Sequence, residues 1–419
     1  GGFCMAIFTA ARLLAYPRAD IAMGLAGLLV LAGVVTLWTT LLPDHAPSPL
    51  VLMLGGFAIC LSSGVPIAFS LCVGALLYIL GDGFIPFAVF AQQASSGIDN
   101  FVLLAVPFFV LTGLAMEVNG MSVRLIELLR RGVGERKGGL NIVTILSMVL
   151  FSGISGSKLA DVTAVGTVMI PAMRRSGHDP SEGVALLAAS AVMAETIPPC
   201  INLIILGYVA NLSIGGLFAA GIYPAILMAG ALILGVIIFS KKAPPAPVET
   251  SGRSLNNLLW SGAVSLGVIV IIFGGYRSGF ATATEIGAFA VAYALLVGRI
   301  VFRELTWRST VHLFIRSATL AGMILFVVAA SQTVAFSLTI DQVPHMLAEA
   351  MINLSHGAGS WAFIVASILI LIVMGAALEG APALIIFGPL LIPVAQSFGI
   401  HPLHYGIVLI VAMGLGLFA

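Results

Sequence analysis

Charged side chains are scarce in this chain. Its 419 residues include only 18 Lys or Arg and 17 Asp or Glu, which is 8% of the sequence, whereas an ordinary soluble domain has about 25%. So few charges cannot cover a water-exposed surface of this size, which excludes a large soluble enzyme domain. The net charge of +1 supplies no excess of basic charge, so we expect no nucleic-acid partner.

Signals for several kinds of chemistry are also missing. The sequence has no GxxxxGK[ST] loop and therefore no ATP site of that kind. The four cysteines have no paired spacing, so neither a disulfide nor a metal-binding cluster is predicted, and we expect no cofactor. The stretch 153–156 reads GISG, a serine-hydrolase pattern, but all seven histidines fall at segment ends or in loops. Without a nearby general base, a hydrolase is disfavoured, and we expect a protein that is not an enzyme.

Long apolar runs are abundant instead. The chain is 60% hydrophobic, and runs of roughly 18 or more apolar residues recur along it, which is typical of membrane-spanning helices. The fold class predicted is an all-α polytopic membrane protein. Residues 50–80 are interrupted at Gly64-Val65-Pro66, so they cross either twice or once as a long kinked span. The other expected spans are 3–16, 21–42, 100–118, 183–212, 215–240, 256–276, 283–302 and 310–338.

Two further apolar blocks, 139–174 and 359–397, have a different pattern. Basic residues crowd both ends of the first block, with Arg130 and Arg131 before it and Arg174 at its end. The positive-inside rule then places both ends on the cytoplasmic side. Each half has about 15 residues and reaches ~23 Å, less than the hydrocarbon core of about 30 Å. The block is therefore predicted to be a re-entrant helical hairpin, and the second block a hairpin that enters from the opposite face.

An internal repeat supports this interpretation. An offset of 222 positions pairs Gly166 with Gly388, Ile170-Pro171 with Ile392-Pro393, Gly177 with Gly399, and Pro180 with Pro402. Inverted repeats with paired hairpins are typical of ion-coupled secondary transporters. The same offset maps Pro198 onto position 420, so we expect the intact protein to continue beyond Ala419 with a Pro-containing helix break.

Candidate site residues lie where the backbone must be irregular at membrane depth, since such backbone survives only where it lines a cavity or is buried in protein. Three segments qualify, namely 152–157, 195–199 and 378–382. Unwound carbonyls bind small cations and helix N-termini attract carboxylates, which indicates sites for Na⁺ and an anionic solute. The candidate ion- and substrate-binding residues are Ser155, Gly156, Ser157, Asp161, Glu195, Thr196, Ile197, Pro198, Glu379, Gly380 and Pro382.

Simpler interpretations remain open for several of these residues. The Gly and Ser residues of the first segment could serve helix packing, and the Pro198-Pro199 pair could be only a kink. Asp161 could do no more than stabilise a helix N-terminus, and Glu379 could be a turn or capping residue. Glu285 is a further acidic residue in apolar context and a functional candidate by default.

The motifs also resemble a known family. The stretch 151–161 (FSGISGSKLAD), Glu195-Thr-Ile-Pro-Pro199 and Gly388-Pro-Leu-Leu-Ile-Pro393 resemble the large membrane subunit of tripartite ATP-independent periplasmic (TRAP) transporters, from about 48 to 419. Residues 1–43 resemble the end of the small membrane subunit plus a linking helix, as in fused QM-type permeases.

The resemblance implies an elevator-type transporter in the bacterial inner membrane. It would import an organic acid together with Na⁺, and a periplasmic substrate-binding protein would deliver the solute. The Na⁺ ligands implied are Ser155, Gly156, Thr196, Pro198, Glu379 and Gly380, although Glu379-Gly380 stands where the family commonly has Asp-Pro. The expected partners are that binding protein, the small membrane subunit fused upstream, the lipid bilayer and a small anionic substrate.

The expected domain organisation follows the hairpins. Two alternatives to a transporter stay open, a scaffold or interaction subunit that moves no substrate and the disfavoured hydrolase. The expected parts are 1–43 (end of the small subunit and linking helix), 48–138 (scaffold helices and amphipathic arm), 139–240 (first hairpin repeat, transport domain), 256–338 (scaffold helices) and 340–419 (second hairpin repeat, truncated C-terminally).

Overall fold

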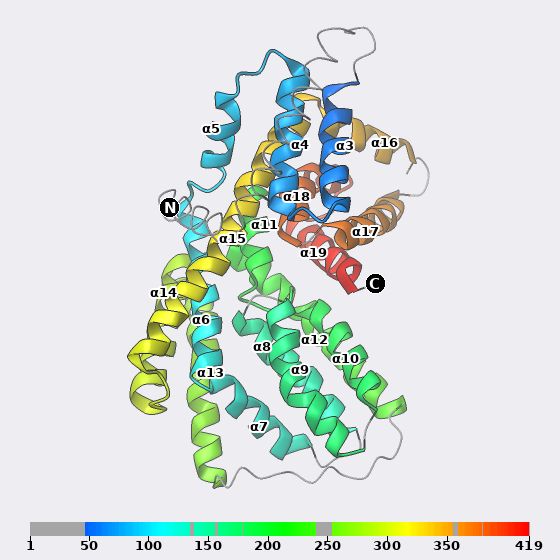
Figure 1. Ribbon diagram of the computed structural model, residues 1–419. Coiled ribbons are helices and arrows are strands. Elements are labelled where there is room, and N and C mark those ends of the chain that lie inside the picture. The colour runs from blue at the N-terminus through cyan, green and yellow to red at the C-terminus, as the bar shows by residue number, and fades with distance from the viewer. Residues whose placement is uncertain are drawn as a thin grey trace. The chain divides into compact units, whose positions relative to one another are not determined.

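The computed structural model describes residues 47–418 apart from 135–137, 156–157, 178, 240–253, 355–358 and 379. The expected spans 3–16 and 21–42 therefore lie outside the described residues, as do Gly156, Ser157 and Glu379. Within the described part all regular elements are helices, and seven of them are long and apolar enough to cross a membrane (Figure 1). The prediction of an all-α polytopic membrane protein is confirmed.

The chain divides into two compact units. The described part of the first comprises residues 47–100, the stretch 319–354 and a short piece of one later helix, 385–391. Its helices are α3 (Pro49–Ser62), α4 (Ile67–Asp82), α5 (Ala88–Ser96), most of α15 (Trp307–Ile340) and α16 (Val343–Leu354).

Helices α3 and α4 settle one of the open alternatives. Ser48 caps α3 by accepting from Val51 N, and α4 starts directly after Pro66. The two helices pack antiparallel, since Gly74 lies against Met53 whereas Gly81 lies against Pro49. The chain thus folds back within residues 50–80, and the single long kinked span is wrong. The turn forms because residue 66 is proline, which disfavours helical backbone at the preceding residue.

The second unit holds most of the chain, and it contains the whole of the first hairpin. Its helices are η2 (Phe101–Leu104), α6 (Ala105–Val118), α7 (Met121–Val133), α8 (Gly139–Ser155), α9 (Lys158–Arg175), α10 (Pro180–Met193), α11 (Ile201–Val209), α12 (Ile214–Phe239), α13 (Leu255–Ser278), α14 (Ala283–Leu296), η3 (Val297–Val301), the start of α15, α17 (Gly359–Ala377), both ends of α18 (Gly380–Ser397) and α19 (Pro402–Phe418).

The hairpin helices are longer than the sequence suggested. Helices α8 and α9, which lie side by side in Figure 1, have 17 and 18 residues, and α17 and α18 have 19 and 18. The expected length of about 15 is wrong because Gly153-Ile154-Ser155 continues α8; a glycine inside a helix costs only about 1 kcal/mol relative to alanine. At 1.5 Å per residue these helices measure about 26 to 29 Å, which is close to a full bilayer core. Their re-entrance therefore stays a prediction based on charge placement.

The internal repeat is confirmed at the level of whole elements. Helices α9 and α18 begin and end 222 positions apart, and α7 and α16 begin at the same offset. The left-handed turns match as well, because Gly177 and Gly399 have φ angles of 70° and 76°. The segment from α6 to α10 thus corresponds to the segment from the second half of α15 to α19. Equal offsets mean that neither repeat has gained or lost a residue relative to the other.

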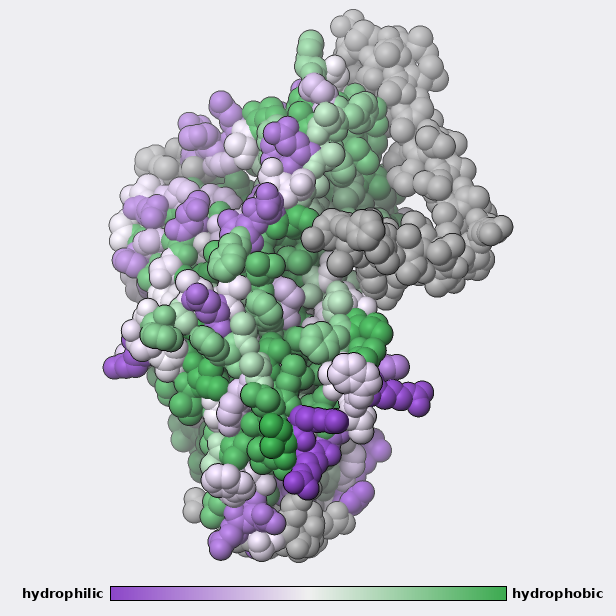
Figure 2. Space-filling view, turned by 90° about the vertical axis from the view of Figure 1, so that its left-hand side faces the viewer, coloured by the Kyte–Doolittle hydropathy of each residue, from purple (hydrophilic) through white to green (hydrophobic). Residues whose placement is uncertain are grey.

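The outer surface fits a lipid environment. Figure 2 shows hydrophobic side chains over much of the face that it presents. On α12, the side chains of Tyr223, Leu227 and Phe239 are 75%, 73% and 83% exposed. Large contiguous apolar surfaces are rare on soluble monomers and mark contact with a partner or a membrane.

The amphipathic helix α7 is anchored through a buried cation. The Arg124 guanidinium donates from Nη2 to Glu304 Oε1 at 2.5 Å and from Nη1 to Asn119 O at 3.1 Å. Its Cζ atom lies 4.0 Å from the centre of the Phe302 ring. The Arg124 side chain is 9% exposed but that of Glu304 is 39% exposed. The contacts of Arg124 with Glu304, Asn119 and Phe302 fix the start of α7 to the segment before α15.

We expect Glu304→Leu to lower the melting temperature of the detergent-purified protein more than Arg124→Leu does. Removing Glu304 leaves a buried cation without its counter-charge, whereas water can hydrate Glu304 when Arg124 is removed. The expected loss for Glu304→Leu is about 1 to 3 kcal/mol, below the fully buried value because solvent reaches the carboxylate. Arg316→Leu is the control, since its pair with Glu117 spans 3.7 Å and is about half exposed. A larger decrease in melting temperature for Arg124→Leu than for Glu304→Leu would contradict this account.

Candidate ion and substrate site

The break between α10 and α11 is built by two prolines. Pro198 and Pro199 carry no N–H, so they cannot supply the donors that a continuing helix would offer to the carbonyls four residues earlier. Helix α10 accordingly ends at Met193 and α11 begins only at Ile201. Every residue from 191 to 200 is buried. The predicted break is therefore present, and it lies inside the protein.

The Glu195 carboxylate is the centre of the site. Its side chain is 2% exposed, and Oε1 accepts a hydrogen bond from Asn202 Nδ2 at 2.6 Å. A Cβ atom on Gly380, the first residue of α18, would lie 3.2 Å from Oε1. A Cβ atom on Gly414, in α19, would lie 2.9 Å from Oε2. The helix break, the start of α18 and the C-terminal part of α19 thus meet around one buried carboxylate.

Asn202 is a site residue that the sequence interpretation missed. It stands in the first turn of α11, seven positions after Glu195 and beyond the prolines. A signal was present, because an amide side chain in an apolar segment needs a buried partner. The spacing could not identify Glu195 as that partner, since the break between them has no regular period.

Helix α12 packs directly on the break. A Cβ atom at Gly221 would collide with the carbonyl oxygen of Thr196. The Thr196 hydroxyl donates to Met193 O at 2.9 Å, so it stabilises the end of α10. Ile197 is 8% exposed and belongs to a buried cluster with Met193 and Ala225. Thr196 and Ile197 therefore hold the shape of the break.

The first hairpin tip is described only at its two sides. Ser155 is the last residue of α8, while Gly156 and Ser157 lie outside the described residues. Asp161 is fully buried in the first turn of α9, where a carboxylate interacts favourably with the helix dipole. Its placement thus agrees with the interpretation that Asp161 stabilises a helix N-terminus, and its binding role stays a prediction.

The second tip is described from Gly380 onward. Pro382 is buried in the first turn of α18, where its missing N–H costs no helical hydrogen bond. Glu379 falls outside the described residues. Of the predicted site residues, the structure brings Glu195 and Gly380 together.

Glu285 has a structural explanation. Its Oε2 accepts from Thr282 N at 2.7 Å and from Thr282 Oγ1 at 2.8 Å, and Thr282 Oγ1 accepts from Glu285 N. This reciprocal pattern is a capping box, which satisfies free N–H groups at the start of α14. Glu285 is therefore a helix-capping residue rather than a default functional candidate.

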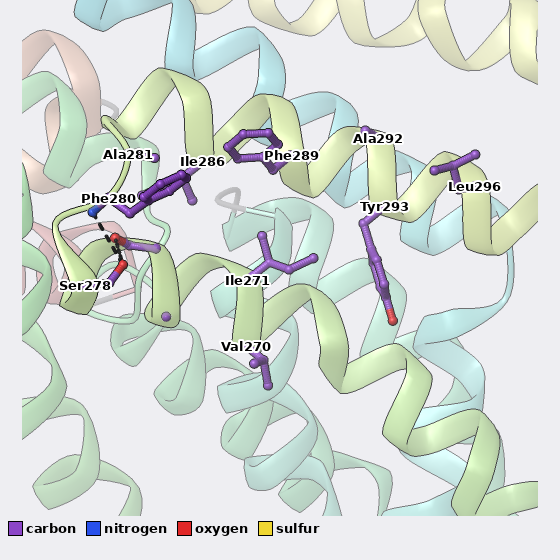
Figure 3. Close-up of a pocket in the computed structure, with 12 residues that line it drawn as sticks. Val270, Ile271, Ser278, Phe280, Ala281, Ile286, Phe289, Ala292, Tyr293 and Leu296 are labelled. Atoms are coloured by element: carbon purple, nitrogen blue, oxygen red, sulfur yellow. Dashed lines mark hydrogen bonds between the residues drawn. The ribbon is translucent and has the colours of Figure 1, made fainter.

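A large groove lies elsewhere, between α13 and α14 (Figure 3). It encloses about 750 Å³ and is lined mainly by aliphatic and aromatic side chains, among them Ile271, Phe289 and Leu296. Tyr293 Oη donates to Val264 O at 2.8 Å, so the hydroxyl is already paired. All the lining residues are described and none is charged, so the groove offers nothing to neutralise an organic anion.

The chemistry at the break suits a hard cation better than a soft transition metal. Within the described ranges, no three His, Cys, Asp or Glu side chains gather where they could hold a metal ion. The groups around Glu195 are carboxylate, amide and carbonyl oxygens, which are hard ligands.

Two glycines of α12 give a matched test of the break. We expect Gly221→Ala to lower the melting temperature by several degrees, because the added methyl group must push α12 away from the Thr196 carbonyl. Gly230→Ala should leave it unchanged or slightly raised, since a Cβ atom there meets nothing within 4 Å. Equal effects of the two substitutions, measured by thermal unfolding in detergent, would show that α12 does not pack on the break as described.

Comparison with known sequences places these features in context. Residues 54–419 match the family "Tripartite ATP-independent periplasmic transporter, DctM component". The 2,3-diketo-L-gulonate TRAP transporter large permease protein YiaN of Escherichia coli is 36% identical over 371 residues, covering 87% of this chain and 85% of YiaN. The sialic acid TRAP transporter large permease protein SiaM of Vibrio cholerae is 34% identical, covering 85% and 83%.

Two further matches extend the comparison. The isethionate TRAP transporter permease protein DctMQ of Oleidesulfovibrio alaskensis is 34% identical, and the match covers 88% of this chain and 58% of that protein. Among solved structures, the YdaH transporter of Alcanivorax borkumensis superposes with a TM-score of 0.55 at 14% identity, covering 89% of this chain and 87% of that one. At that identity the likeness concerns the fold alone.

Proposed function

Because the chain belongs to the family of the DctM component of tripartite ATP-independent periplasmic transporters, we propose that it couples the import of an organic acid to Na⁺. Members of this family are multi-pass permeases of the bacterial inner membrane, transporters rather than enzymes, that depend on a substrate-binding protein. The proposal adds the coupling ion, the place where it acts and the motion that carries the solute.

The observation that carries the proposal is the buried Glu195 carboxylate at the helix break. A carboxylate 2% exposed in an apolar protein is costly unless its charge is compensated. Nearby stand the backbone carbonyls of the break, to which the two prolines offer no helical donor. Carboxylate and carbonyl oxygens together form an environment suited to Na⁺. Asp161 and the predicted tip residues would complete the sites, with Ser155, Gly156 and Ser157 at the first tip and Glu379 and Pro382 at the second.

The substrate class follows from charge and from relatives. Helices α11 and α18 begin next to the Glu195 carboxylate. The positive ends of their helix dipoles favour anionic groups. The names of relatives refer to 2,3-diketo-L-gulonate, isethionate, sialic acid and C4-dicarboxylates. All are organic anions, so the solute proposed here is an organic acid handed over by a periplasmic binding protein. A small membrane subunit, fused upstream of residue 48, is part of the proposed complex.

The proposed motion is an elevator. The two hairpin repeats, re-entrant from opposite faces, would move together as a transport domain against the scaffold helices 48–138 and 256–338. The confirmed internal repeat supports this proposal, since paired repeats of this kind underlie alternating access in many secondary transporters.

The function is tested in proteoliposomes that contain the intact permease with its small subunit. We expect uptake of a radiolabelled organic acid, tried in turn as succinate, sialic acid and isethionate, only with the cognate binding protein and an inward Na⁺ gradient. Replacing NaCl by choline chloride should reduce the initial rate at least tenfold. Uptake at the same rate in choline chloride would refute Na⁺ coupling while leaving the transporter assignment intact.

The elevator is tested by disulfide crosslinking. One cysteine is placed in α6 and one in α8, two helices that pack together. The disulfide between them should abolish uptake, because it ties a scaffold helix to the first hairpin. Reduction of the disulfide should restore uptake. A pair across α17 and α19, both in the second hairpin repeat, is the control and should leave uptake unchanged. Normal uptake with the α6–α8 crosslink closed would contradict the sliding motion.

A further inference from the structure

The amide of Asn202 occupies the space in which a side chain of residue 380 would stand. A Cβ atom on Gly380 would lie 2.5 Å from Asn202 Nδ2, closer than real Cβ contacts come. The same nitrogen donates to Glu195 Oε1 at 2.6 Å. Asn202 thus contacts the break on one side and the first residue of α18 on the other.

We propose that Asn202 is a positioning residue for the ion-coupled site. Through its hydrogen bond it holds the Glu195 carboxylate against the start of α18, and it thereby keeps the second hairpin closed on the α10–α11 break. This inference rests on the function proposed above and assigns a role to a residue outside the motifs of the sequence.

The geometry favours a hydrogen-bonding role over simple packing. The Glu195 carboxylate is 2% exposed, so water cannot replace a lost donor, and an ionised carboxylate can only accept. Gly414 brings α19 to the other oxygen of the same carboxylate. A rotation of the Glu195 side chain would therefore disturb both α18 and α19, and the amide is placed to prevent it.

A shift in the position of the second tip changes the apparent affinity for the ion. If only the closed arrangement binds Na⁺ well, the apparent dissociation constant rises as the closed fraction falls. Loss of a hydrogen bond to a buried charged group corresponds to about tenfold or more in an equilibrium. The maximal stabilisation at saturating Na⁺ should change little, because the ligands themselves remain.

The test compares Asn202→Leu, which removes the amide at similar size, with Asn202→Gln, which keeps an amide donor. Purified permease with its small subunit is unfolded by heat while NaCl replaces choline chloride at constant ionic strength and constant pH. The probe is Na⁺ alone, and the readout is the NaCl concentration that gives half of the full rise in melting temperature.

We expect Asn202→Leu to raise this concentration about tenfold, because the Glu195 carboxylate loses its amide donor. Asn202→Gln should raise it by no more than about threefold, because it retains an amide that can donate to the carboxylate. Gly380→Ala should resemble Asn202→Leu, whereas Gly230→Ala should match the wild type.

The inference is overturned if the Leu and Gln variants behave alike. Failure of the proposed function gives a different result, since NaCl would then not raise the melting temperature of the wild type at all. In that case the melting temperature in choline chloride decides. A decrease for Asn202→Leu that Asn202→Gln largely avoids supports the positioning role, and equal decreases refute it.

Discussion

A buried carboxylate beside an interrupted backbone is the constraint on which the described site depends. Proline removes two donors from the α10–α11 segment, and residues 191–200 are all buried. The polar groups of this segment must therefore be accommodated inside the protein. Helices α12, α18 and α19 pack closely on it, since an added Cβ would meet the Thr196 carbonyl at Gly221 and the Glu195 carboxylate at Gly380 and Gly414. The packing of several helices thus follows from one local irregularity.

The sequence predicted the features that depend on local chemistry. The position of the break follows from Pro198 and Pro199, and the repeat follows from an offset that the helix bounds reproduce. The interruption at Gly64-Val65-Pro66 left both one and two crossings possible for residues 50–80, and the antiparallel contacts of α3 and α4 decided for the fold-back. Glu285 could have been explained from sequence, because Thr282 three residues before it is the signature of a capping box.

Other features depend on three-dimensional contacts that no period encodes. Asn202 and Gly380 are 178 positions apart in the chain, so neither residue type by itself indicates that they touch. Helix length also misled the sequence interpretation, because Gly153 and Ser155 were assigned to a turn, whereas α8 continues through Ser155. Small residues are compatible with both a helix and a turn, so residue type alone did not locate the end of α8.

The two repeats share a backbone plan but differ in chemistry. At the offset of 222, Glu195 corresponds to Leu417 and Thr196 to Phe418, while Gly380 corresponds to Lys158. The acidic group thus belongs to the break of the first repeat, yet it contacts the tip of the second. A motion of either repeat alone would separate Glu195 from Gly380 and leave a buried carboxylate poorly packed, at a cost typical of buried charges. The contact therefore ties the helix break of the first repeat to the start of α18 in the second.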